Sequence, residues 1–170
     1  DWVVLFESNA VVASEALFDW LLEQPDGDYF FRLLATDRAG NVSEVIHPIV
    51  VDGTDPDAEL VLPEDQSWAG PQLELTGTAN DLHLSGYRIS MANRLPDDTV
   101  GTMTALASAE LPVVDDLLAA PRPALPSGDY QLLLQVWDKA GNIHEATRDF
   151  RYVNALPEPP LDIQAELFER

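Results

Sequence analysis

The stretch GDYFFRLLATDRAGN, residues Gly27–Asn41, occurs a second time as GDYQLLLQVWDKAGN, residues Gly128–Asn142. Residue 27 aligns with residue 128, and this offset of 101 aligns the two stretches from end to end without a gap. Both begin with Gly-Asp-Tyr and end with Asp-x-Ala-Gly-Asn. An internal repeat of this length indicates one domain per period.

Both copies predict a β-hairpin. Apolar residues recur with the period of two that is typical of a strand with one face in a core. The Asp-x-Ala-Gly-Asn sequence predicts a turn in which glycine adopts a left-handed conformation and the aspartate accepts hydrogen bonds from turn amides. A returning strand is expected over residues 42–51 and 143–153. The predicted inner faces comprise Tyr29, Phe31, Leu33, Ala35, Val45, Ile49 and Val51 in the first copy, and Tyr130, Leu132, Leu134, Val136, Ala146, Phe150 and Tyr152 in the second.

A tyrosine follows a Gly-Asp corner at the start of each predicted strand, and this arrangement looks like the tyrosine corner of immunoglobulin-like sandwiches. With the Asp-x-Ala-Gly-Asn turn and the acidic Pro-containing linker, it resembles tandem immunoglobulin-like or fibronectin-type-III-like modules of bacterial surface proteins. The resemblance implies an all-β fold of tandem immunoglobulin-like β-sandwiches. It also implies an extracellular or cell-surface protein without enzymatic activity, because such modules serve as stalks, spacers, adhesin shafts and enzyme appendages.

The repeat predicts the domain boundaries. Asp1 aligns with Thr102, so the first copy lacks a counterpart of residues 58–101. We expect residues 1–53 to be the C-terminal half of one module and residues 54–155 to be a complete module. Residues 156–170 are expected to form a linker and, over 161–167, the first strand of a next module. The incomplete first module has two competing explanations: a boundary cut from a longer chain, or completion by strands from another copy.

Four further strands are expected in the complete module. They cover residues 58–62, 72–79, 85–92 and 103–108, with a polar loop over 93–100. Residues 113–127 are expected to be a short strand or an irregular crossover. Pro121 and Pro123 exclude a helix there, and by alignment they argue against the helix-like pattern of residues 14–24.

The net charge of −21 restricts the function classes. Nucleic-acid binding requires lysines and arginines on phosphates, and the chain has one lysine, Lys139. The chain contains no apolar run of about 20 residues, which is the length that a membrane-spanning helix needs, so no membrane span is expected. The expected partners are therefore neighbouring modules of the same protein or further copies of it.

Calcium is the predicted ligand, because hard cations prefer oxygen donors and a bound ion at a module junction would hold two modules at a fixed angle. Asp52, Asp55 and Asp57 lie in the predicted linker, and Asp81 is a further donor from the second module. The competing interpretation is a solvated acidic linker whose aspartates cap turns. The next junction carries Val153, Leu156 and Glu158 instead of three aspartates, which argues against a repeated site.

No catalytic motif stands out. His47, His83 and His144 lack metal-ligand spacing, and we found no nucleophile elbow and no cysteine nucleophile. Trp137, on the outer face of its strand, and Trp68, in an expected loop, either stack on sugars or pack on protein. The leading hypothesis is a stalk or spacer module. The alternatives are a fibre subunit completed by strand exchange between copies, and a carbohydrate- or receptor-binding appendage of an enzyme.

Overall fold

The computed structural model describes residues 2–10, 16, 19 and 23–154, and its regular elements are all β-strands. The chain divides into two units, residues 1–53 and 54–170. In the first unit, β1 (Gly27–Thr36) pairs antiparallel with β2 (Val42–Val51), with Gly27 opposite Val51 and Thr36 opposite Val42. The predicted first hairpin is confirmed. The predicted segments 14–24 and 161–167 lie largely or wholly outside the described residues.

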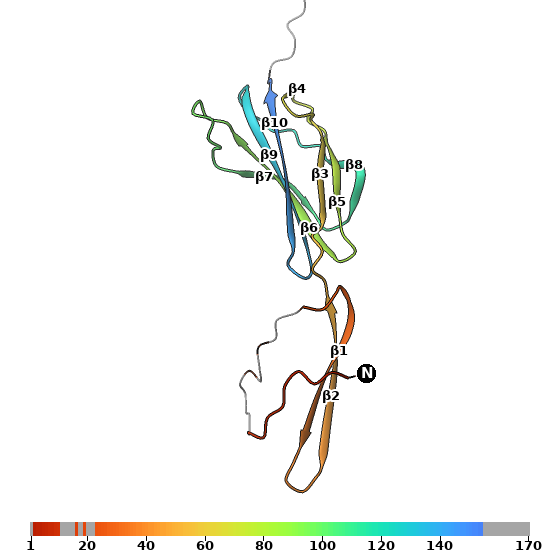
Figure 1. The fold of residues 1–170 in the computed structure, drawn as a ribbon. Helices are drawn as coiled ribbons and strands as arrows, with labels where there is room; N and C mark the ends of the chain where they lie inside the picture. The colour runs from red at the N-terminus through yellow and green to blue at the C-terminus, as the bar shows by residue number, and fades with distance from the viewer. Residues whose placement is uncertain (1, 11–15, 17–18, 20–22, 155–170) are drawn as a thin grey trace, which may run out of the picture. The chain divides into compact units, whose positions relative to one another are not determined.

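The second unit is a two-layered sandwich of a five-stranded and a three-stranded sheet (Figure 1). The five-stranded sheet has the order β4-β10-β9-β6-β7, and the three-stranded sheet has the order β3-β5-β8. The strands are β3 (Asp57–Leu62), β4 (Ser67–Ala69), β5 (Leu75–Asn80), β6 (Leu84–Asn93), β7 (Thr104–Ala109), β8 (Val113–Ala119), β9 (Gly128–Asp138) and β10 (Ile143–Tyr152).

The core of the second unit lies between its two sheets. The predicted inner face of β9 is buried: Leu132, Leu134 and Val136 are fully buried, and Tyr130 nearly so. Leu60 of β3 and Leu75 of β5 lie in the same buried cluster, from the opposite sheet. The prediction of an immunoglobulin-like β-sandwich is confirmed.

One glycine fixes how closely two strands of the smaller sheet approach. A Cβ atom added to Gly77 would lie 1.9 Å from the carbonyl oxygen of Glu59 in β3. Any side chain at position 77 would therefore push β3 away from β5.

The structure selects the short strand from the two alternatives left open for residues 113–127, and it assigns a strand to a second segment that was expected to be a loop. Residues 113–119 of the expected crossover form β8, which pairs with β5, while Pro121 and Pro123 follow the strand. Trp68 was expected in a loop, but it lies in β4, which pairs parallel with β10. A three-residue strand is too short to show a periodic pattern, so no sequence signal indicated β4.

In the first unit, β1 and β2 correspond to β9 and β10 of the second unit. No covering layer lies over β1 and β2 among the described residues. Leu33 is 40% exposed, whereas its counterpart Leu134 is 0% exposed. Val45 is 59% exposed, whereas its counterpart Ala146 packs against the core of the second unit. The described residues of the first unit therefore form a hairpin without a covering sheet.

Candidate functional site

The Asp-x-Ala-Gly-Asn turns are closed hydrogen-bonded units in both copies. Asp138 Oδ1 accepts hydrogen bonds from the backbone N–H groups of Gly141 (2.6 Å) and Asn142 (2.9 Å), and Oδ2 accepts one from Asn142 Nδ2 (2.7 Å). Asp37 Oδ1 accepts from Ala39 N and Asn41 N, and Oδ2 accepts from Asn41 Nδ2. The glycines have φ angles of 88° at Gly40 and 99° at Gly141, in the left-handed region that glycine tolerates.

These hydrogen bonds favour the ionised aspartates. Burial acts to raise the pKa of Asp138, but the hydrogen bonds from Asn142 and the turn amides outweigh it and hold this pKa below its usual value. The side-chain hydrogen bond from Asn41 is the main cause of the lowered pKa of Asp37. Because both oxygens of each carboxylate already accept bonds inside the turn, the turns stabilise the hairpins and offer little to a substrate.

Both predicted tyrosine corners are formed. The Tyr29 hydroxyl donates to the carbonyl oxygen of Pro25 at 2.8 Å, and the Tyr130 hydroxyl donates to that of Pro126 at 3.0 Å. Tyr130 also contacts the Tyr152 ring edge-on, with ring centroids 6.1 Å apart. The tyrosines therefore fix the chain where it enters β1 and β9.

A polar network that the sequence did not predict links distant segments beside the edge of β10. Arg94 donates from Nε and Nη2 to the two carboxylate oxygens of Asp149, at 3.0 and 2.6 Å. Gln131 Nε2 donates to Asp149 Oδ1, and the backbone N–H of Asp149 donates to Asp65 Oδ1. The hydrogen bond to Asp149 is the main cause of the raised pKa of Arg94. The residues of this polar network are far apart in the sequence, so no local sequence pattern predicts it.

Two side chains of β10 reach the backbone at the start of the module and along β3. His144 Nδ1 lies 2.8 Å from the carbonyl oxygen of Pro56. Arg148 donates from Nε and Nη2 to the carbonyl oxygen of Leu60, at 3.0 and 2.6 Å. These contacts connect the two sheets of the sandwich, and they account for His144 as a structural residue.

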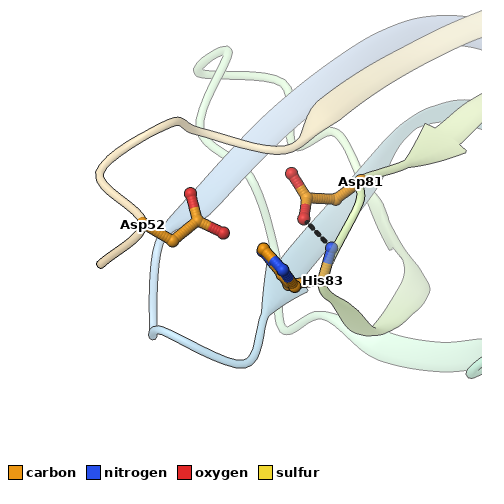
Figure 2. A group of neighbouring side chains, drawn as sticks. All are labelled: Asp52, Asp81 and His83. Carbon is orange, nitrogen blue, oxygen red and sulfur yellow. Dashed lines mark hydrogen bonds between the residues drawn. The ribbon is translucent and has the colours of Figure 1, made fainter. Parts of the chain in front are cut away.

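The predicted calcium ligands occupy separate positions in the two units. Asp52 follows β2 in the first unit. In the second unit, Asp55 and Asp57 are exposed, and Asp81 accepts a hydrogen bond from the backbone N–H of His83 at 2.6 Å (Figure 2). Among the described residues of the second unit, Asp55, Asp57 and Asp81 do not form a group of three metal-ligating side chains. Figure 2 shows Asp52 of the first unit and Asp81 and His83 of the second, and each of these side chains carries an atom of a kind that ligates metals. His83 was not among the predicted ligands.

The tryptophans present their rings to arginines. Trp68 is 71% exposed, and the Arg151 guanidinium lies 5.1 Å from its ring centroid. Arg88 lies 5.9 Å from the ring of Trp137, which also covers Gly86. Trp137 therefore packs on protein, as one of the two interpretations of its sequence position expected.

The described surface has shallow, open depressions in place of an enclosed cleft. One depression lies beside the β1–β2 turn and another beside β4. Among the described residues, no helix has the length and apolar character needed to cross a membrane.

The comparisons with known proteins agree with this arrangement. A family model described as a bacterial Ig-like domain matches residues 19–53 and 96–154. The two matched segments lie on the two copies of the repeat and together span more than half of the chain. No curated protein matches the chain. The chain belongs to the bacterial Ig-like domain family, whose domains act as structural or adhesive modules of multidomain proteins.

Proposed function

We propose that the chain is a non-enzymatic spacer segment of a secreted or cell-surface bacterial protein, and that its complete module bears tension along the polypeptide. The observation that carries the proposal is the path of β3 and β4 beside β10. Pro56 contacts His144, Leu60 contacts Arg148, and Ser67 pairs with Phe150. The first strands of the module therefore follow β10 in the same direction along its whole length.

This path determines how the module responds to tension. The chain enters beside the start of β10, at Pro56, and leaves at the end of β10, after Tyr152. A force on the two ends therefore pulls β4 and β10 past each other. Their hydrogen bonds, together with the bond from Val153 N to Ala69 O (2.9 Å), are loaded at the same time. Bonds loaded together resist more force than bonds that break one after another.

Single-molecule pulling of the chain by its two ends tests the proposal. We expect an abrupt unfolding event with a contour-length gain of about 30 nm, from roughly 3.5 Å per residue over the module. Replacing Arg148 with methionine should lower the unfolding force by removing two hydrogen bonds between β10 and β3. Gradual extension without an abrupt event would refute a load-bearing role.

The fibre hypothesis remains a second candidate, because the hairpin of the first unit exposes an apolar face at Leu33 and Val45. Light scattering over a range of protein concentrations tests it. A fibre subunit should grow in mass with concentration, whereas a spacer segment should remain a monomer.

The calcium prediction also remains open as a proposal for Asp52, Asp55, Asp57 and Asp81. A hard cation bound by the acidic linker would stiffen a spacer. If that cation binds only the folded protein, it also stabilises the fold by mass action. Its test is given among the predictions below.

A further inference from the structure

A shallow depression of the second unit lies beside β4, and its lining combines an exposed tryptophan with polar side chains. β4 is an edge strand of the five-stranded sheet, next to the end of β10 (Figure 1). The depression has a volume of about 360 Å³ and is lined by residues 62–64, 67–70 and 72–74. Small-molecule sites have volumes of roughly 300–1,000 Å³, so the depression is large enough for a small ligand.

Trp68 holds its indole ring at the rim of this depression. The side chain is 71% exposed, although its strand is fixed by pairing with β10, where Trp68 lies opposite Arg151. The Arg151 guanidinium lies over the ring, 5.1 Å from its centroid, and Arg151 Nε lies 3.8 Å from Asp129 Oδ1. Because the guanidinium lies over one face of the indole, the exposed area belongs mainly to the opposite face and the ring edge. An indole face carries partial negative charge and therefore attracts the partly positive C–H groups of a sugar ring.

Three polar side chains of the same depression are available to a ligand. Glu64, Gln72 and Glu74 are exposed, and within the described part of the chain their side chains make no hydrogen bond or ion pair. Carboxylates accept hydrogen bonds, and an amide both donates and accepts them, so these groups match hydroxyl groups that do both. The two glutamates disfavour an anionic ligand, which leaves a neutral polyhydroxylated one.

We propose that this depression binds a neutral sugar residue of a glycan. The exposed face of Trp68 stacks on the C–H face of the pyranose ring, and Gln72 and Glu74 form hydrogen bonds with its hydroxyl groups. Small-molecule sites combine an apolar surface with a few polar groups that fix orientation, which is the composition found here. A protein partner fits less well, because glutamates are depleted at the centres of protein interfaces. The inference goes beyond the spacer role and does not depend on it.

Fluorine NMR of the full chain, labelled with 5-fluorotryptophan, locates the binding site. The chain has four tryptophans, and the Trp68 resonance is assigned by its loss in the Trp68→Ala variant. The probes are neutral tetrasaccharides of glucose, galactose, mannose or N-acetylglucosamine, and an acidic tetrasaccharide of galacturonic acid. We expect at least one neutral probe to shift the Trp68 resonance saturably, with a Kd of about 1 mM because the site is shallow, and to leave the Trp137 resonance in place.

Saturation-transfer NMR, which observes the sugar, compares the affinities of the variants. Trp68→Ala should weaken binding by at least about tenfold, and Gln72→Ala by about threefold. Gln72 lies outside the strands, so Gln72→Ala tests the site even if Trp68→Ala disturbs β4. The matched control is Phe30→Ala, which removes another exposed aromatic ring, in β1 of the first unit, and should bind like the unaltered chain.

The other outcomes overturn the proposal. If no neutral probe shifts the Trp68 resonance, or if only the acidic probe does, the proposed ligand class is wrong. Unchanged affinity in both Trp68→Ala and Gln72→Ala would place the sugar elsewhere on the chain. If the Trp68 resonance moves only with rising protein concentration and without sugar, Trp68 is a contact between copies of the chain, and the depression is no sugar site.

Discussion

Leu134 and Leu33 occupy the same position in the two copies, and truncating each to alanine should have very different consequences. Leu134 is 0% exposed and lies in the core cluster, whereas Leu33 is 40% exposed. Leu134→Ala removes buried methyl groups and leaves a cavity, which costs about 3 kcal/mol within the usual range for buried leucines. For a domain of about 100 residues this lowers the melting temperature by roughly 10–20 °C. Leu33→Ala creates no comparable cavity and lies outside the second unit.

Thermal and urea unfolding of the full chain, followed by circular dichroism, measure the difference. The main cooperative transition should belong to the second unit, and only Leu134→Ala should shift it. The two variants remove the same atoms from the same motif, so each is the control for the other. Equal shifts would show that the two hairpins are buried to the same extent, and the division into a complete and an incomplete sandwich would be wrong.

Tyr130→Phe should destabilise the second unit by about 1 kcal/mol through loss of the bond to Pro126, with Tyr29→Phe as a silent control in the same denaturation assay. Because the folded-state pKa of Asp138 is lowered, its stabilisation is present above the unfolded pKa of about 4 and lost as the pH falls through the folded value. Asp138→Asn should therefore lower stability at neutral pH and flatten its loss in acid, and a variant that keeps the wild-type acid dependence would contradict this. Chelation should lower the melting temperature if calcium binds, and Asp55→Ala should weaken that response; the absence of any calcium-dependent shift would end the calcium prediction.

The sequence predicted the elements that depend on local signals. The hairpins, their turns and the tyrosine corners each follow from a short run of residues whose conformational preferences agree. The inner face of β9 could be predicted because alternation alone separates its two sides. β4 and the contacts of Arg148 could not be predicted in this way, because β4 is short and Arg148 meets residues far from it in the sequence.

The candidate site was less accessible to prediction for a physical reason. An acidic surface supplies many carboxylates, so their sequence spacing does not distinguish a ligand set from a solvated linker. Asp81 was identified as a donor, but its backbone partner His83 was set aside because isolated histidines have no recognisable spacing. The folded turn brings Asp81 and His83 together. The fold, and not the sequence spacing, therefore determines which side chains could bind one ligand.

The two copies separate what a hairpin encodes by itself from what its neighbours supply. The tyrosine-corner bonds are 2.8 and 3.0 Å long, and the bonds from the asparagine N–H to the turn aspartate are 2.9 Å in both copies. These local bonds form whether or not a second sheet covers the hairpin. The burial of Leu134, by contrast, requires strands from elsewhere, and Leu33 has none among the described residues. Since an isolated two-stranded hairpin is marginally stable in water, the local motif specifies the shape and the covering strands supply most of the stability.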